Sequence, residues 1–548
     1  MNPASMPQIV IPRSKFLQEY DHVTSFLHGD LIPLDCFEVL PGDDFSVHKA
    51  AAEIIMSTPI APMMANIKTK VVAFFVPTRL LWEHTEEFYG ANKTSAGPQT
   101  TVYKIPTRSL FRNGVPMNSV SHYLGKPYCS FDTNKYNYGK VSILKERAYW
   151  FIWSEWYRAQ QIQAPFIMNK GDGDGNAVIG TIAGWEYTTN RVPAKVCKQI
   201  DIFTAATTSP QYGSAVELPL GSFAPVVMST DTPGEEFEGL QVRNAGTTGL
   251  NRVALNTTNP NQTPLQTYIG VLGDTEINSG VKLEADLSSA TAAKINDIRY
   301  AFQLQKYLER ANFGSRFFEV LAVHYGITSP DSRLQRPEYL GGKSAPIVIR
   351  PVLSQAGYEA GTTSKVGQLG AVSQTYIDYS GLFSKGFVEP GYVMILLSTN
   401  HERLYAQGIM REDYKTDRFE FYSPEFNNLG DQAILNKEIM LTGDDTDEQV
   451  FGYQGHWDEY RYRLKRVSGL MDPNVPNSLD FWTLAEKFSS RPSLSESFIV
   501  ENRDNISRAL VTGESGPDYL CDFYCEYMAT REMSMYAIPG LIDHFGAL

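Results

Sequence analysis

Short runs of β-branched and aromatic residues, each bounded by turn-forming residues, recur along the chain. The run Ile67–Val76 predicts a strand that ends at Pro77, because proline cannot donate to a sheet ladder. Most of the chain after residue 346 has the same character, with short aromatic runs separated by Gly, Pro and Asn. That pattern is typical of a β-sandwich or barrel. The strands predicted there are Pro346–Val352, Gly386–Ser398, Arg418–Phe421, Ile434–Leu441, Tyr460–Val467 and Phe498–Glu501.

A few segments show helical periodicity instead. Val141–Ile162 is the longest of them, and apolar side chains such as Leu144, Ala148 and Ile152 recur in it every three to four residues. Its many aromatic residues predict a heavily buried helix. The other predicted helices are Arg79–Phe88, capped by Thr78 and ended by Gly90, about 290–311, and Phe317–His324.

Two long segments show neither the alternation of a strand nor the periodicity of a helix. Residues 1–27 are predicted to be an N-terminal arm with a short turn near Phe16–Tyr20, and residues 91–139 are irregular throughout. Irregular loops of this length are uncommon inside a compact domain. We therefore expect residues 1–45 and 91–139 to become ordered by packing on neighbouring copies of the chain.

A third segment, residues 244–281, has an unusual composition. It contains six Asn, seven Thr and five Gly, and its only charged residues are Arg252, Asp274 and Glu276. Asn, Thr and Gly favour turns and short exposed strands, and low charge suits a surface that contacts a partner. A flexible solvent-exposed loop is the alternative interpretation.

The composition narrows the class of protein. The chain has 548 residues, of which 43% are apolar and 20% are charged, so it is neither disordered nor short of a core. No apolar run approaches the roughly 20 residues of a membrane helix, and the N-terminus lacks a secretory signal. The net charge of −13 means that the chain cannot condense nucleic acid alone. Five scattered cysteines indicate assembly in a reducing compartment rather than a disulfide framework.

Catalytic and cofactor motifs are missing from the sequence. We find neither HExxH nor GxSxG, and Gly342-Lys343-Ser344 lacks the earlier glycine of a phosphate-binding loop. We therefore predict no catalytic residues and no cofactor. Asp172, Asp174 and Asn176 begin like a calcium loop, but Ala177 and Ala183 replace its central glycine and closing glutamate. These three residues remain a weak surface calcium candidate, and a solvated turn is the alternative.

The most basic stretch of the chain is Arg461–Arg466. On the predicted strand, Arg461, Arg463 and Lys465 would share one face, with Arg466 beside them. Tyr462 would lie on the opposite face. Such a ridge could bind phosphates while aromatic rings stack on bases. Pairing with acidic groups of this or a neighbouring subunit is the alternative.

Several long segments resemble one known family. They are His28–Phe45 (HGDLIPLDCFEVLPGDDF), Ala73–Glu83 (AFFVPTRLLWE), Arg147–Gln160 (RAYWFIWSEWYRAQ), Ser329–Gly342 (SPDSRLQRPEYLGG), Phe451–Met471 (FGYQGHWDEYRYRLKRVSGLM) and Tyr536–Phe545 (YAIPGLIDHF). By these segments the chain resembles the major capsid proteins of Microviridae, the small single-stranded DNA bacteriophages, and most closely those of the gokushovirus branch. The resemblance covers nearly the whole length.

The resemblance implies a fold and a set of partners. The fold would be mainly β, an eight-stranded antiparallel jelly-roll barrel with long, partly helical insertions, and residues 1–548 would form a single capsid domain. Copies of the chain would assemble in the bacterial cytoplasm into a T=1 icosahedral shell, the virion capsid, around circular single-stranded DNA. The implied partners are a small basic DNA-binding protein, a minor pilot protein, an internal scaffolding protein and a host cell-surface receptor, without membrane insertion.

The resemblance also gives a role to residues 204–290. They match, in place and character, a surface insertion that projects at the three-fold axes of such capsids, and we expect them to contact the host. An apolar cluster where three copies meet, or a small local core, could be formed by Leu265, Tyr268, Ile269, Val271 and Leu272. The competing hypothesis for the whole chain is a β-sandwich carbohydrate-binding module or enzyme, since catalytic sites need not be local in sequence.

Overall fold

The computed structural model describes most of residues 12–536. The residues that it leaves undescribed within this span are 62, 93–100, 136, 167, 174–191, 215, 217–225, 231–240, 243–250, 253–280, 286–294, 313, 315, 349–350, 354–368, 373 and 428. The chain divides into two compact units, one made of residues 1–212 and 309–548 and the other of residues 213–308. No helix in the described ranges combines the length and the apolar character that a membrane span needs.

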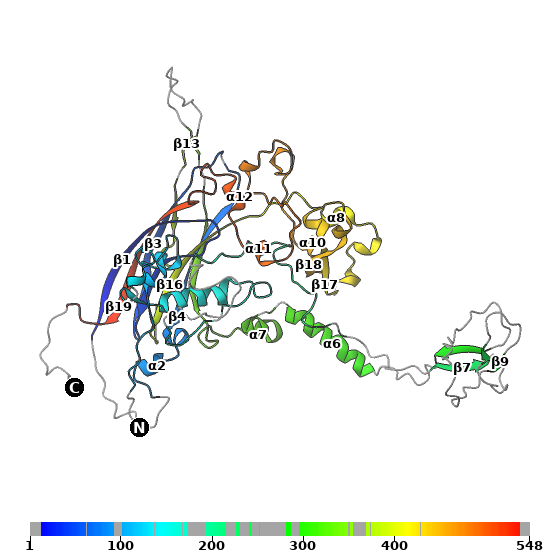
Figure 1. The fold of residues 1–548 in the computed structure, drawn as a ribbon, viewed down its shortest axis with the longest axis horizontal. Helices are drawn as coiled ribbons and strands as arrows, with labels where there is room; N and C mark the ends of the chain where they lie inside the picture. Colours follow the sequence, from blue (N-terminus) through cyan, green and yellow to red (C-terminus); the bar gives the residue numbers. More distant parts are fainter. Residues whose placement is uncertain are drawn as a thin grey trace, which may run out of the picture. The chain divides into compact units, whose positions relative to one another are not determined.

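Two antiparallel sheets form the centre of the larger unit (Figure 1). One sheet has the order β1-β19-β3-β14, with β15 also pairing with β3, and the other has the order β11-β4-β16-β2. The strands are β1 (Arg13–Phe26), β2 (Ile32–Val39), β3 (Asp44–Met56), β4 (Ile67–Pro77), β11 (Glu338–Pro346), β14 (Thr375–Asp378), β15 (Ser384–Gly386), β16 (Gly391–His401) and β19 (Tyr519–Glu532).

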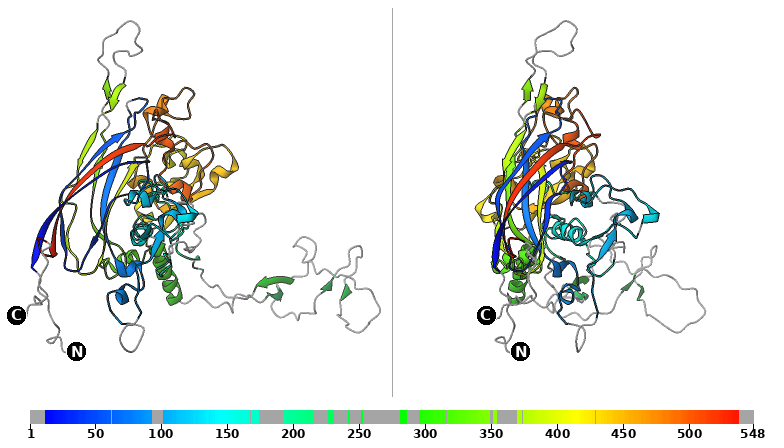
Figure 2. Two further views of the ribbon diagram at one scale, coloured as in Figure 1. Left: turned by 60° about the vertical axis from the view of Figure 1, so that its left-hand side comes forward. Right: turned by 90° about the vertical axis from the view of Figure 1, so that its left-hand side faces the viewer.

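The strand order is that of a jelly roll. Leaving out β15, the eight strands follow the orders first–eighth–third–sixth and second–seventh–fourth–fifth, and all neighbours are antiparallel. The prediction of a mainly β, antiparallel jelly roll is confirmed. Among the described residues no ladder joins the two sheets, so they pack face to face rather than closing into one barrel (Figure 2).

Buried and exposed side chains alternate along the strands of the first sheet. In β19, Tyr519, Cys521, Phe523, Cys525 and Tyr527 are buried, whereas the residues between them face away from the core. Because successive side chains point to opposite faces, this alternation turns one face of each strand toward the space between the two sheets. The same core takes in alternate residues of β3 and β16.

The second sheet is buried on both faces. Val71, Ala73 and Phe75 of β4 point into the core between the sheets, and Val72 and Phe74 point into a second core. The helix α5 (Leu144–Ile152) covers that outer face, and a π-helical turn, Trp153–Tyr157, extends it. Burial on both faces explains why β4 and β16 are continuous apolar runs in the sequence.

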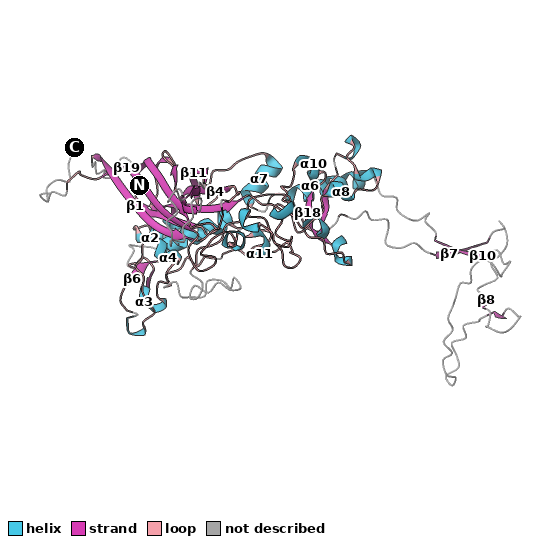
Figure 3. Cartoon of the chain, turned by 90° about the horizontal axis from the view of Figure 1, so that it is seen from above, coloured by secondary structure: helices cyan, strands magenta, loops and turns pink. Residues whose placement is uncertain are grey.

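The insertions between the strands hold the helices (Figure 3). Helix α6 (Ile295–Asn312) and helix α7 (Phe317–Tyr325) agree with their predictions. The predicted helix Val141–Ile162 is shorter at both ends, and Arg79–Phe88 is broken into α1 (Thr78–Leu81) and α2 (Thr85–Phe88), with Thr78 inside the helix rather than capping it.

The remaining short elements lie in these insertions and in the smaller unit. They are β5 (Thr107–Ser109), α3 (Leu110–Asn113), α4 (Val120–Tyr123), β6 (Lys140–Ser142), β7 (Val226–Thr230), β8 (Gln241–Val242), β9 (Asn251–Arg252), β10 (Val281–Ala285), β12 (Pro351–Leu353), β13 (Leu369–Val372), α8 (Arg411–Tyr414), β17 (Asp431–Leu435), α9 (Asn436–Ile439), β18 (Val450–Gly455), α10 (Asp458–Arg461), α11 (Glu496–Ile499) and α12 (Asp504–Ser507). Strand β7 pairs with β10, and β8 with β9, within the smaller unit.

The prediction of an N-terminal arm is wrong for residues 13–26. They form β1, which pairs with β19 along its full length, and the turn expected near Phe16–Tyr20 is absent from it. Phe16 and Tyr20 pack against the core as alternate residues of this strand. The charged residues Lys15, Glu19 and Asp21 hid the alternation, because they lie on the exposed face of the same strand.

Three predicted strands are helical turns. Residues Arg418–Glu420 form a 3-10 turn because the Glu420 carboxylate accepts backbone N–H bonds at the start of the turn. Phe498 and Ile499 belong to the helical turn α11, in which the backbone N–H groups of both donate to Ser495 O. The third, Tyr460–Val467, begins in a helical turn. The strands predicted at Pro346–Val352 and Ile434–Leu441 overlap β11, β12 and β17 only in part.

Candidate functional site

The basic segment Arg461–Arg466 is not a strand. It follows Trp457, whose φ of 70° reverses the chain into the short helix α10. Tyr462 is extended, residues 463–465 belong to no helix or strand, and Arg466 forms a single β-bridge with Tyr405. The prediction of a ridge along one strand is therefore wrong, because Arg461 sits on a helical turn and the later cations do not lie on a strand.

Carboxylates of the same chain already pair with three of the four cations. Arg461 lies 2.6 Å from Asp458, and Arg466 lies 3.7 Å from Asp413. Lys465 forms an ion pair with Glu402. Hydrogen bonds from Asn66 and Lys465 hold the pKa of Glu402 at about 2, so this carboxylate is ionised under all ordinary conditions.

Arg463 differs from the other three cations. No carboxylate of the described residues lies within ion-pair distance of it. It lines both a pocket of about 600 Å³ and a second pocket of about 310 Å³. Tyr460 and Tyr462, close to it in the sequence, expose 57% and 63% of their surface, so two accessible aromatic rings belong to the same segment as Arg463.

Equal numbers of positive and negative side chains line the larger pocket. Four carboxylates and four cations line it, together with three tyrosines, so it has no strong field of either sign. Asp201 in its wall accepts a 2.7 Å hydrogen bond from the Tyr405 hydroxyl. The lining residues of these types are Asp201, Glu402, Asp431 and Asp458, Arg403, Arg461, Arg463 and Lys465, and Tyr405, Tyr453 and Tyr462.

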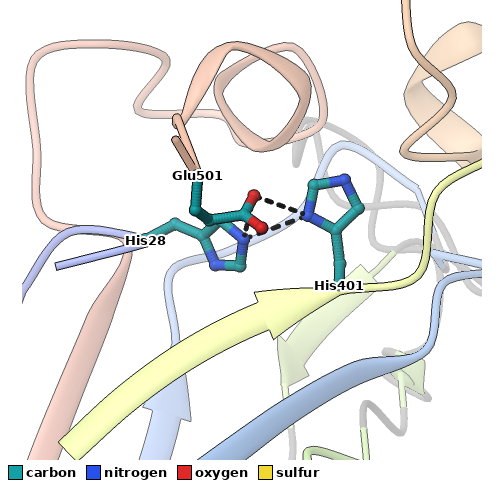
Figure 4. A group of neighbouring side chains, drawn as sticks. All are labelled: His28, His401 and Glu501. Carbon is teal, nitrogen blue, oxygen red and sulfur yellow. Dashed lines mark hydrogen bonds and ion pairs between the residues drawn. The ribbon is translucent and has the colours of Figure 1, made fainter. Parts of the chain in front are cut away.

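A buried charge network lies behind this pocket, and Arg403 belongs to both. The network centres on His28, in the turn after β1, His401, the last residue of β16, and Glu501, which follows α11 (Figure 4). All three side chains are fully buried. We call these three residues the His–His–Glu cluster.

The three donor atoms of the cluster form a nearly equilateral triangle. His28 Nε2 lies 3.0 Å from His401 Nδ1, and each lies 3.2 Å from Glu501 Oε1. These separations are close to the edges of a zinc tetrahedron, which has bonds of about 2.0 Å. The spacing alone would therefore suit a metal ion.

The hydrogen-bond partners of the rings do not fit a metal ion. His401 Nε2 lies 3.1 Å from Nη1 of Arg403, which has only hydrogens to donate, so Nε2 accepts and the proton of neutral His401 resides on Nδ1. That proton faces His28 Nε2 at 3.0 Å and Glu501 Oε1 at 3.2 Å, and it removes the lone pair that a metal would need. Arg403 also forms an ion pair with Glu501 and thereby supplies the cation of the site.

Tyr519 completes a consistent assignment of protons. Its hydroxyl lies 3.1 Å from His28 Nδ1, and His28 Nε2 lies 3.0 Å from His401 Nδ1. With the proton of His401 on Nδ1, His28 Nε2 accepts from His401 and His28 Nδ1 donates to Tyr519. Glu501 lies 3.2 Å from both rings, and its carboxylate is held by the ion pair with Arg403.

Charged side chains surround the cluster in equal numbers. Arg403 pairs with Glu486 as well as Glu501, and Lys198 lies 3.7 Å from Glu486. Asp518 accepts from the backbone N–H of His28 at 2.8 Å and from Arg503 at 2.8 Å. Asp30 lies 2.6 Å from Lys195. Four cations thus offset four carboxylates around the cluster.

Burial and charge set the pKa values in this network. Burial, with Arg403 beside the ring, lowers the pKa of His401 to about 4. Burial alone would raise the pKa of Glu501, but Arg403 and the two histidines hold it well below its usual range. At neutral pH the network therefore contains ionised Glu501 and neutral His401.

The other predicted site residues are placed only in part. Asp172 accepts a 2.6 Å hydrogen bond from the indole of Trp82 and lies 3.6 Å from His84. Asp174 and Asn176 lie outside the described residues, so the calcium candidate stays a prediction. The apolar residues proposed for the protrusion also lie outside the described part of the chain: Leu265, Tyr268, Ile269, Val271 and Leu272.

Sequence reasoning missed the His–His–Glu cluster. His401 and Arg403 come at the end of the apolar run of β16, but neither was predicted as a site residue. A histidine and an arginine at the end of a fully buried strand were the available signal, because such side chains are rarely buried without partners. Nothing in the spacing could link them to His28 or Glu501.

Comparisons with known proteins agree over almost the whole chain. Residues 4–541 match the family described as "Capsid protein (F protein)". A protein of Bdellovibrio phage phiMH2K named "Capsid protein VP1" is 34% identical over 548 residues, which cover 99% of this chain and 98% of the relative. Proteins with the same name from Chlamydia phage 1 and Spiroplasma virus 4 are 32% and 30% identical, and cover 98% and 97% of this chain and 97% and 96% of their own.

Proposed function

Because the chain belongs to the capsid protein (F protein) family, we propose that its copies self-assemble into a T=1 icosahedral shell around circular single-stranded DNA. The resemblance to Microviridae major capsid proteins is confirmed, and the protein is a structural component of the virion. The shell geometry, the genome and the gokushovirus branch remain part of the proposal.

Exposed apolar side chains in residues 101–139 support assembly most directly. These residues contain β5, α3 and α4. Large exposed apolar side chains, when they gather in one patch, mark a protein interface. The large side chains that are at least 60% exposed there are Val102, Met117, Tyr128, Phe131 and Tyr138.

The charge of the chain supports a basic partner. A net charge of −13 cannot neutralise a packaged genome, so a small basic DNA-binding protein is needed beside the shell. A pilot protein and an internal scaffolding protein complete the set that we propose. Arg463, with Tyr460 and Tyr462, is the part of the basic segment that we assign to the DNA or to a neighbouring subunit.

Host contact is assigned to residues 204–290, which overlap the smaller compact unit, residues 213–308. The composition of residues 244–281 supports a surface that binds through hydrogen bonds at small desolvation cost. A catalytic role is not part of the proposal. A substrate could not reach the His–His–Glu cluster, because its three side chains are fully buried.

Particle size tests the proposal. Purified chain at assembly conditions is expected to form megadalton shells in sedimentation and electron microscopy, and a monomer would contradict the proposal. Changing both Phe131 and Tyr138 to Ser should abolish the shells while leaving the melting temperature of the unassembled chain unchanged, because both rings are exposed. Normal shells from this variant would show that residues 101–139 do not form the contact.

A further inference from the structure

The His–His–Glu cluster joins segments that are far apart in the chain. Residues 194–198 lie between two of them, since Leu31 N donates to Ala194 O at 2.8 Å and Glu501 N donates to Val196 O at 2.8 Å. The cluster side chains close this arrangement from one side. The turn after β1, residues 194–198 of one insertion and the end of the 402–518 insertion therefore meet around three buried side chains.

We propose that the His–His–Glu cluster is an acid-labile clasp, which holds these segments together while His401 is neutral and releases them when His401 takes up a proton. This proposal rests on the fold alone and not on the shell function. The clasp gives the chain a proton-sensitive opening at the end where its two largest insertions meet.

Geometry makes His401 the sensitive member. Its only site for a second proton is Nε2, which lies 3.1 Å from Arg403 Nη1. Protonation there would set two donors and two positive charges face to face in a buried site.

No nearby group can offset the added charge. The carboxylates around the cluster are already matched by cations, so a proton on His401 leaves the buried set with an excess positive charge. Opening of the clasp removes this excess charge from the interior, because the His401 ring then returns to water. The titratable and charged groups that face the cluster from the packed elements are His28, Asp30, Lys195, Lys198, Arg403, Glu486, Glu501, Arg503, Asp518 and Tyr519.

Hydrogen exchange on the full unassembled chain tests the clasp. With a pKa of about 4 in the closed state and an ordinary value in the open state, the open population should rise roughly 50-fold between pH 7 and pH 4.5. After correction for intrinsic exchange, residues 27–31, 194–198 and 499–505 should lose protection together. The central strand β4 should keep its protection over this range.

A variant separates His401 from the neighbouring carboxylates. His401→Asn places an amide N–H near the position of Nδ1, so it keeps a donor that faces Glu501. Because the amide does not titrate, the increase in the open population between pH 7 and pH 4.5 should shrink to a few-fold. His48→Asn removes an exposed histidine and should behave like the unaltered chain. A 50-fold rise in His401→Asn, or unchanged protection of the unaltered chain at pH 4.5, would overturn the proposal. Should His401→Asn not fold, the profile of the unaltered chain decides alone.

Discussion

The ring nitrogens Nε2 of His28 and Nδ1 of His401 lie 3.0 Å apart in the interior, although 373 residues separate them in the sequence. The pair can form only after the first and seventh strands of the jelly roll have come together. Contacts of such long range are entropically expensive to close and form late in folding. The cluster therefore reports on the completed fold rather than on any single element.

Arg403 should be the most sensitive position of this network. Arg403→Gln removes the cation that pairs with both Glu486 and Glu501 and leaves two buried carboxylates without it. We expect a loss of about 3–5 kcal/mol in the free energy of unfolding, as found when one partner of a buried ion pair is removed. Urea denaturation of the unassembled chain measures it. Arg418→Gln, at an exposed position, is the control and should change stability by less than about 0.5 kcal/mol.

Gly29 is required by the close approach of Glu501. Its φ is +78°, and a Cβ at this position would lie 2.7 Å from the carbonyl oxygen of Glu501 and 2.8 Å from its Cγ. Gly29→Ala therefore combines backbone strain of about 1–2 kcal/mol with a clash against backbone that cannot move freely. We expect a lower melting temperature and greater hydrogen exchange at residues 499–505. Gly90→Ala shares a positive φ but meets nothing within 4 Å, so it isolates the strain from the clash. Equal effects of the two substitutions would contradict this explanation.

Local pattern was enough to predict β4, β16, α6 and α7, because each carries an uninterrupted apolar run or a helical period. Strands β1, β3 and β19 escaped prediction, since charged residues occupy their exposed face and break the run. In β1, for example, Glu19 and Asp21 flank Tyr20. The jelly-roll topology came from the family resemblance and not from the pattern, because strand order depends on contacts that no local window contains.

For the candidate site as well, local sequence showed the residue types but not the long-range contacts. The four cations of Arg461–Arg466 were visible in the sequence, but their neutralisation was not, because Glu402 and Asp413 lie about fifty residues or more upstream. Only the structure singles out Arg463. The buried network was out of reach for the same reason, since its members come from both ends of the chain.

Asp35 provides a prediction on pH dependence. Burial raises the pKa of Asp35 to about 6, although the Tyr527 hydroxyl donates to it at 2.5 Å. Between pH 6 and 4 the folded chain binds this proton and the unfolded chain does not, so this group contributes stability as the pH falls and a cost of about 3 kcal/mol above pH 6.

Asp35→Asn should remove that cost and keep an acceptor for Tyr527. We expect the variant to be more stable than the unaltered chain at pH 8, with an advantage that fades as the pH falls below 6. Urea denaturation at pH 8, 6 and 5 measures the difference. Asp522→Asn, which changes an exposed carboxylate of β19, should give no such pH-dependent gain. A constant difference at all three values would mean that the titration of Asp35 is not its cause.

Arg463 should contribute to DNA binding where Arg461 does not. Arg463→Gln removes the cation that has no carboxylate partner among the described residues, whereas Arg461→Gln removes one that Asp458 already neutralises. For Arg463→Gln we expect weaker binding of single-stranded DNA and a salt slope lower by about 0.7, the value for one phosphate contact. The absorbance ratio of purified particles should also show less packaged DNA. If both variants bind DNA like the unaltered chain, Arg463 serves a subunit contact instead.

Residues 244–281 should be dispensable for assembly and necessary for attachment. Replacing them with a short Gly-Ser turn removes the Asn- and Thr-rich segment but leaves all strands of the two sheets in place. Shells are expected to form in normal yield, because loop replacements between intact elements change the closure entropy only slightly. Attachment to host cells, measured by co-sedimentation of labelled particles, should fall at least tenfold if the polar segment supplies the contact. Replacing residues 354–368, which come between β12 and β13 in the sequence, with a Gly-Ser turn is the control and should leave attachment unchanged. Normal attachment of particles without residues 244–281 would show that the segment is a tolerated insertion with no receptor role.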